Sequence, residues 1–264
     1  YSPKLFVANM SKDQAWELVQ IKGLTAWANS YLDQSYAIQN METDLIDGVK
    51  LCLLVEAIKA RSEELSKKPV PKWTRKPAHR MQKVENSNVA INYLAGPVGV
   101  KVTTGAEDIV GNQDSNKSNL KMVLGLFWAT FRKTLGLTEG TSQSEEHAAL
   151  LEWVRELTAG YKGVDVKGMK DSWGDGLAFN AMLHKAGVKL DYDSLDAGNG
   201  EANLQQAFKL AEEHFKIPQL LEIPDLLACN PDERTVAFYL NLLKHAMADY
   251  FEKNKIKMGV QALQ

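Results

Sequence analysis

The sequence is poor in cysteine, with only Cys52 and Cys229 among its 264 residues. Neither belongs to a CxxC pair, and both stand in apolar segments with a helical pattern. We therefore expect buried free thiols and a reducing compartment rather than a disulfide framework. No run approaches the ~18 apolar residues that span a membrane, and no signal-peptide pattern opens the chain. These absences indicate a cytoplasmic protein, and a first residue of Tyr1 rather than Met indicates a fragment of a longer polypeptide.

Patterns of catalytic and metal-binding residues are also absent. The histidines form no HExxH pair, and residues 191–202 lack the Gly and Glu that a calcium loop needs at its sixth and twelfth positions. No Walker loop, GxSxG or dinucleotide fingerprint occurs, and a net charge of -2 gives no reason to expect a nucleic-acid partner. We expect no cofactor and no metal, and an all-α enzyme is the weakest of three function classes considered.

The chain does contain a series of helical patterns. Apolar residues recur at spacings of three and four, without sustained period-two runs, so we predict an all-α fold. The first pattern has Ser11 available as its cap. A polar, basic, proline-bearing loop is expected over 61–80. The expected helices cover 13–33, 48–60, 81–95, 118–135, 146–159, 174–186, 201–215 and 232–252.

The second half repeats the first. Trp27 and Trp153 are 126 positions apart, and the turns Asp47-Gly48 and Asp175-Gly176 are 128 apart. Four further pairs share an offset of 117: Asn86 and Asn203, Ala90 and Ala207, Val100 and Ile217, and Ile109 and Leu226. A period above 100 residues indicates a duplicated domain rather than a solenoid. We predict one domain over 13–137, a Gly/Ser/Thr-rich linker over 138–145, a second domain over 146–252 and a basic tail over 253–264.

Several motifs resemble those of calponin-homology (CH) domains, in the same order in both halves. They are WELVQ (16–20), TAWANSYL (25–32), DLIDGVKL (44–51), KVENSNVA (83–90), GAEDIV (105–110), SWGDGLAF (172–179) and PDER (231–234). The resemblance covers roughly residues 14–252 and points to the tandem CH actin-binding domain of the filamin, α-actinin and spectrin group. It implies about four main helices per domain plus short ones. Two departures from the pattern are Gly23 with Leu24 in the first helix, and a longer segment over 111–119.

The resemblance implies a function as well as a fold. It makes the chain a filamentous-actin-binding module of a larger, oligomeric cross-linking or scaffolding protein in the actin cytoskeleton. Binding is expected mainly through the first CH domain, with the second regulating affinity. The alternative is a CH-type signalling or microtubule-associated adaptor with weak actin affinity.

Two helices of the first domain are the expected actin contacts by resemblance. On the first, polar residues fall away from the Trp27/Tyr31 stripe: Gln20, Lys22, Thr25, Asn29 and Ser30. Without the resemblance, these residues would be interpreted as an ordinary solvated polar face of the helix. On the second, nine of the twelve residues in 120–131 are apolar, more than one core stripe needs; the alternative is a buried core helix. Its expected contacts form an exposed apolar patch with a basic rim: Leu120, Lys121, Val123, Leu124, Phe127, Arg132 and Lys133. The helix over 147–159 is a weaker third candidate.

Two further sites follow from the resemblance and from charge. Trp128 and Arg234 occupy positions at which a tryptophan of the first domain stacks on a basic residue of the second, forming an interdomain latch. The alternative is that Trp128 belongs to the core and Arg234 caps a helix. The basic loop offers Lys72, Arg75, Lys76 and Arg80 to phosphoinositide head groups or to actin, and otherwise reads as a solvated loop.

Overall fold

The computed structural model describes residues 11–111, 116–137 and 140–254. Every regular element within these ranges is a helix, which confirms the all-α prediction. The chain divides into two compact units. The first unit consists of the described residues within Gln20–Thr138, and the second unit consists of residues 11–19 together with 140–254. No helix in the described ranges is both long and apolar enough to cross a membrane.

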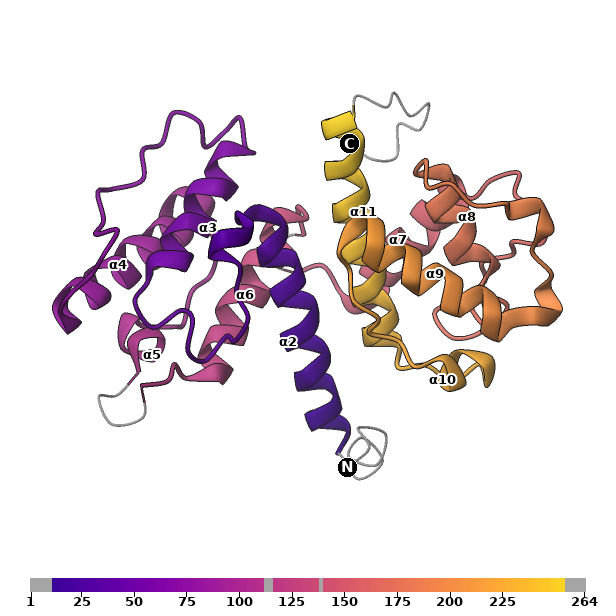
Figure 1. Cartoon of the computed structure of the whole chain (residues 1–264), viewed down its shortest axis with the longest axis horizontal. Coiled ribbons are helices and arrows are strands. Elements are labelled where there is room, and N and C mark those ends of the chain that lie inside the picture. The colour runs from indigo at the N-terminus through magenta and orange to yellow at the C-terminus, as the bar shows by residue number, and fades with distance from the viewer. Residues whose placement is uncertain (1–10, 112–115, 138–139, 255–264) are drawn as a thin grey trace. The chain divides into compact units, whose positions relative to one another are not determined.

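The first half of the chain forms helices close to the predicted positions (Figure 1). They are α2 (Lys12–Tyr31), η1 (Gln34–Tyr36), α3 (Val49–Ala60), α4 (Arg80–Tyr93), the π-helical turn η2 (Leu94–Val98), α5 (Ala106–Val110) and α6 (Leu120–Thr134). Ser11 caps α2 as expected, since its Oγ accepts from the Gln14 amide at 3.2 Å and Gln14 Oε1 accepts from the Ser11 amide at 2.9 Å.

Aromatic side chains join α2 to α6 inside the first unit. The indole of Trp27 meets the rings of Phe127 and Phe131 edge-on, at centroid distances of 6.2 and 5.7 Å. All three side chains are buried. Each such ring contributes about 1.5–3 kcal/mol by burial alone, so these contacts fix the two helices on which the expected binding residues lie.

The second half of the chain repeats this arrangement. Its helices are α7 (Gln143–Leu157), α8 (Leu177–Lys185), η3 (Tyr192–Ser194), η4 (Ala197–Asn199), α9 (Gly200–Phe215), α10 (Ile223–Leu227) and α11 (Glu233–Asn254). The core of the second unit is aromatic: Trp173 stacks on Phe179 at 5.0 Å, and Phe179 and Phe208 meet Tyr239 edge-on at 5.8 and 5.5 Å.

A buried asparagine organises the first unit at the start of α3. Asn86 of α4 donates from Nδ2 to the carbonyl oxygens of Asp47 and Thr74, at 3.1 and 2.9 Å, and its Oδ1 accepts from the Thr74 amide at 2.8 Å. Gly48 precedes α3 with φ +71°, a left-handed conformation that favours glycine. A Cβ on Gly48 would lie 2.7 Å from the Asn86 Cβ, so this turn also needs glycine for space.

The same arrangement of a buried asparagine and a left-handed glycine recurs in the second unit. Asn203 of α9 donates from Nδ2 to the carbonyl oxygens of Asp175 and Asp196, both at 2.8 Å. Gly176 has φ +70°, and a Cβ there would again lie 2.7 Å from the asparagine Cβ. Asn86 and Asn203, which the sequence repeat pairs, therefore make equivalent hydrogen bonds to the backbone in the two units.

Some local predictions need correction. Cys52 is buried in α3, and burial raises its pKa to about 12. Cys229 is exposed, and the prediction that it is buried in a helix was wrong. It lies just after α10 in a turn with φ +53°, so its backbone cannot continue the helix. Helix α7 begins within the predicted linker at Gln143, because Ser142 and Glu145 form a capping box.

The predicted long segment over 111–119 is only partly described. Residues 112–115 lie outside the described ranges, as do positions 138–139 of the linker and 255–264 of the tail. The end of the segment is held in place: the Ser118 amide donates to the Glu42 carbonyl at 2.7 Å, and the Asn119 amide donates to the Asp108 carbonyl at 2.7 Å. Asn119 then caps α6.

Candidate functional site

The polar face of α2 lies in the first unit and is partly structural. Lys22 is exposed, and Gln20 and Thr25 are half-buried. Asn29 binds the backbone of Ile38 through both ends of its amide, at 2.9 and 2.7 Å. The Ser30 hydroxyl donates to the Trp27 carbonyl at 2.7 Å. Asn29 and Ser30 therefore stabilise the fold through hydrogen bonds to the backbone. This structural role was not predicted from the sequence.

The apolar residues expected to face a partner from α6 are largely core. Val123, Leu124 and Phe127 are buried, so the prediction that they form an exposed apolar patch was wrong. With about 3.6 residues per turn, these three fall on one stripe with Leu126, Thr130 and Phe131, which are also buried. The sequence reading overestimated the apolar surplus because it counted residues instead of projecting them around the helix. Leu120 remains half-buried at the start of the helix.

The opposite side of α6 presents a different surface. Five accessible residues recur there at spacings of three and four: Lys121, Gly125, Trp128, Ala129 and Arg132. We call them the α6 stripe. A Cβ on Gly125 would meet nothing within 4 Å, so the middle of the stripe is open and shallow. Lys133 is exposed beside it. The surface is thus basic at both ends, with two small residues and the half-buried indole of Trp128 between them, rather than a wide apolar patch with a basic rim.

The four predicted residues of the basic loop divide into two groups. Arg75 forms an ion pair with Glu56 at 3.1 Å and stacks 4.0 Å from the ring of Trp73. Arg80 forms an ion pair with Glu107. Lys72 and Lys76 are exposed. Arg75 is thus held against Glu56 and Trp73 although it is exposed, Arg80 joins the start of α4 to α5, and the two lysines are further accessible charges.

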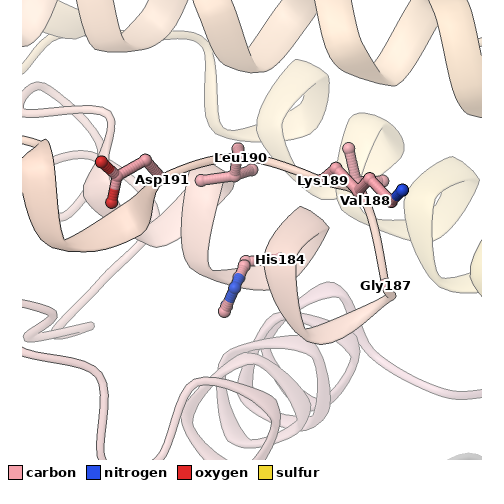
Figure 2. Close-up of a pocket in the computed structure, with 6 residues that line it drawn as sticks. All are labelled: His184, Gly187, Val188, Lys189, Leu190 and Asp191. Atoms are coloured by element: carbon pink, nitrogen blue, oxygen red, sulfur yellow. The ribbon is translucent and has the colours of Figure 1, made fainter.

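Three of the shallow hollows on the described surface lie beside polar side chains. One of about 560 Å³ lies between the basic loop and α4, lined by Pro69, Pro71 and Tyr93 among others. The other two, of about 540 and 390 Å³, share His184, Leu190 and Asp191 in the second unit. Figure 2 shows His184 on its helix, with Leu190 and Asp191 on the segment that returns after Gly187. Tyr161 and His184 share a hydrogen bond of 2.8 Å there. The described residues contain no group of three side chains placed to hold a metal ion.

Arg234 lies at the start of α11, in the second unit. Its guanidinium binds the Asp232 carboxylate at 3.1 Å and lies 5.1 Å from the ring centroid of Trp16. Trp128 packs in the first unit, 5.9 Å from the ring of Phe131. Because Trp128 and Arg234 belong to different units, the latch expected between them stays a prediction.

Comparison with known proteins identifies the class to which this architecture belongs. Residues 18–135 and 144–248 each match the family described as the calponin homology (CH) domain. The chain therefore belongs to the calponin homology family and carries two CH domains in tandem, which confirms the resemblance found in its motifs.

Two relatives and one solved structure show which CH proteins the chain is similar to. The chain is 36% identical to human (Homo sapiens) α-actinin-4 over 240 residues, which cover 89% of this chain and 25% of that protein. It is 36% identical to cortexillin-1 of Dictyostelium discoideum over 247 residues, which cover 92% of this chain and 52% of that protein. The chain thus spans only a quarter to about half of these relatives. Among solved structures, the actin-crosslinking core of Schizosaccharomyces pombe fimbrin matches the fold with a TM-score of 0.51. That match covers 86% of this chain and 48% of the fimbrin chain at 22% identity.

Proposed function

We propose that this chain is a filamentous-actin-binding module that acts without catalysis of its own. The observation that carries the proposal is the tandem pair of CH domains, aligned over 89% of the chain with α-actinin-4. We further propose that the first CH domain provides most of the binding and that the second regulates it. On this proposal the protein works at the actin cytoskeleton in the cytoplasm.

The geometry of α6 supports this choice of surface. Filamentous actin is acidic, so the exposed Lys121 and Lys133 favour encounter with it. Gly125 and Ala129 add little bulk to the stripe, whereas the half-buried Trp128 beside them gives it one large apolar side chain. Lys22 on α2 adds a further exposed cation in the same unit. Val123, Leu124 and Phe127 support the surface from beneath rather than contacting the filament.

Co-sedimentation with actin filaments tests the proposal. The double variant Lys121→Glu/Lys133→Glu should weaken binding about two- to thirtyfold, because each exposed ion pair contributes about 0.2–1 kcal/mol. The matched control is Lys185→Glu/Lys189→Glu, which makes the same charge change on exposed residues of the second domain. The control should bind as the unaltered chain does. An equal loss in both double variants would mean that net charge, rather than the α6 surface, drives binding.

The same assay with microtubules decides the alternative. A CH-type signalling or microtubule-associated adaptor would sediment with microtubules and only weakly with actin. Saturable binding to actin and none to microtubules is the expected result. The reverse pattern would replace the proposal with the alternative.

Phosphoinositide head groups are a second proposed partner, specific to the basic loop. Lys72 and Lys76 are exposed cations of this loop, Arg75 is exposed beside Glu56, and Arg80 joins the start of α4 to α5. Vesicles containing a phosphoinositide should bind the chain more strongly than phosphatidylserine vesicles of equal charge. Lys72→Ala/Lys76→Ala should remove the difference, and equal binding to both kinds of vesicle would contradict the proposal.

Cross-linking of filaments is proposed only for the whole protein. One module binds one filament, and a cross-link needs a second site supplied by an oligomer or by other domains. The relatives are longer than this chain, since it covers 25% of α-actinin-4 and 52% of cortexillin-1.

A further inference from the structure

The hollow beside α4 in the first CH domain has two walls that run side by side. One wall is α4, and the other is the irregular segment 68–74. At one end the Tyr93 hydroxyl donates to the Lys68 carbonyl at 2.7 Å. At the other end the Asn86 side chain bonds the amide and the carbonyl of Thr74, at 2.8 and 2.9 Å. The segment is therefore anchored at both ends and runs antiparallel to the helix. We call the space of about 560 Å³ between them the α4 groove.

The walls of the α4 groove are mainly apolar. Pro69 and Pro71 lie on the segment, Val89 and Tyr93 lie on α4, and Pro97 lies in the turn η2. Tyr93 is buried at the base, whereas the other four are exposed or half-buried. Apolar grooves that contain an aromatic residue are the surfaces on which proline-rich peptides dock in the polyproline II conformation. The size of the groove is also in the range of ligand sites, about 300–1,000 Å³.

Two asparagine side chains provide hydrogen-bonding groups along the helical wall. Asn88 and Asn92 line the groove and are exposed. Neither side-chain amide has a hydrogen-bond partner among the residues that the structure describes. Four residues of an α-helix rise about 6 Å, and two residues of a polyproline II helix rise about 6.2 Å. The two amides therefore match the spacing of alternate backbone carbonyls in such a peptide, which makes no internal hydrogen bonds.

The charge around the α4 groove favours an acidic ligand. Residues 67–84 contain seven Lys and Arg residues and no Asp or Glu. Lys67, Lys72 and Lys76 are exposed, and Lys72 lines the groove itself. Glu85, which also lines the groove, opposes this preference locally. An acidic peptide would therefore be attracted by the loop and repelled at one position.

The second CH domain does not repeat these side chains. At the offset of 117, Asn88 and Asn92 correspond to Gln205 and Lys209. The offset between the halves falls from 128 at Gly48 to 117 at Asn86, so the intervening loop is 11 residues shorter in the second half. The groove is therefore not a requirement of the fold that the two domains share.

We propose that the α4 groove is a docking site for an extended, acidic, proline-containing peptide of another protein. The prolines of the peptide lie between Pro71 and Val89, and its backbone carbonyls accept from the Nδ2 groups of Asn88 and Asn92. This binding needs no actin, so its test is separate from that of the proposed function.

Fluorescence polarisation with labelled peptides tests the site on the whole chain. The probes are the acidic proline peptide EAPPAPPE, its glycine counterpart EAGGAGGE and its neutral counterpart QAPPAPPQ. EAPPAPPE should bind saturably, and QAPPAPPQ should bind about two- to thirtyfold more weakly, because two exposed ion pairs are lost. EAGGAGGE should also bind more weakly. Equal binding of EAPPAPPE and EAGGAGGE would overturn the proposal, because a general anion-binding surface would then explain both.

Substitutions in the two walls should change peptide binding in different directions. Lys72→Gln should weaken the binding of EAPPAPPE about two- to fivefold, and Glu85→Gln should strengthen it by a similar factor. Asn88→Ala/Asn92→Ala should weaken it about five- to a hundredfold, because two hydrogen bonds are lost. The matched control is Gln205→Ala, an exposed residue at the position of the second domain that corresponds to Asn88, and it should bind as the unaltered chain does. Far-UV circular dichroism verifies that each variant is folded, as expected at exposed positions.

Unchanged binding to the Asn88→Ala/Asn92→Ala variant would refute the placement of the peptide along α4. Actin filaments then test whether the site is separate from the proposed actin surface. Figure 1 shows α4 and α2 at opposite edges of the first unit, so EAPPAPPE should bind equally with and without saturating filaments. Loss of peptide binding on filaments would overturn a separate docking site. If the chain bound the peptide as expected but did not sediment with actin, the proposed function would fail and the docking site would stand.

Discussion

Replacing glycine by alanine should have opposite effects on stability at Gly48, in the turn before α3, and at Gly125, in the middle of α6. Gly48 has φ +71°, and a Cβ there would lie 2.7 Å from the Asn86 Cβ and 2.8 Å from the Ser87 amide nitrogen. Gly125 lies on an accessible face of α6, and a Cβ there would meet nothing within 4 Å. We expect Gly48→Ala to destabilise the first domain and Gly125→Ala to stabilise it.

The size of each effect follows from separate causes. A left-handed backbone costs a residue with a Cβ about 1–2 kcal/mol. The overlap at Gly48 involves backbone and a buried Cβ, so α4 must move, which costs about 1–3 kcal/mol as overpacking does. Gly48→Ala should therefore cost about 2–5 kcal/mol. Gly125→Ala removes only the entropic penalty of a helical glycine and should gain about 0.5–1 kcal/mol.

Urea unfolding of the whole chain measures both effects. Because domain stabilities are about 5–15 kcal/mol, Gly48→Ala should move the unfolding transition of the first domain to clearly lower urea. Gly176→Ala should do the same to the second domain, since its Cβ would meet Asn203 at the same 2.7 Å. A loss below about 1 kcal/mol for Gly48→Ala would refute this account of the turn. A loss of any size for Gly125→Ala would refute the account of the open helix position.

Three further predictions concern buried polar and titratable groups. Asn86→Ala should cost about 2–4 kcal/mol in urea unfolding, because three hydrogen bonds of a buried amide are lost, whereas the exposed Asn88→Ala should cost under about 0.5 kcal/mol. A thiol reagent at neutral pH should modify Cys229 and leave Cys52 intact until unfolding, as a mass spectrum would show, because Cys52 is buried with a pKa of about 12. Partial burial raises the pKa of Asp44, but hydrogen bonds from two backbone amides and a lysine outweigh it and hold the value below the ordinary 3.8. The stability from these bonds is therefore present above that value and is lost as the pH falls through the depressed pKa, so Asp44→Asn should flatten the acid limb of a stability–pH curve below about pH 4.

The features that sequence predicted well depend on local chemistry. The cap at Ser11, the turn at Gly48 and the basic loop each follow from residue types whose backbone preferences are strong. The repeat offset of 117 was informative because Asn86 and Asn203 make equivalent hydrogen bonds that require one side chain at one distance. Such constraints act between residues close in sequence, or through one side chain with fixed hydrogen-bond partners.

The features that sequence predicted poorly depend on what surrounds a helix. Apolar content showed that α6 has a core face, but not how many apolar residues that face could hold. Val123, Leu124 and Phe127 all lie on it, because it meets Trp27 of α2 as well as its own neighbours. Cys229 was misplaced for a related reason, since an apolar context also occurs in a turn that closes over a core.

Trp16 shows most clearly why periodicity alone is insufficient. It precedes Trp27 by eleven residues, or about three turns, so helical periodicity places both on one stripe of α2. The structure gives them different neighbours, because Trp27 meets Phe127 in the first unit whereas Trp16 meets Phe238 and Arg234 in the second. A stripe specifies which residues are covered but not what covers them.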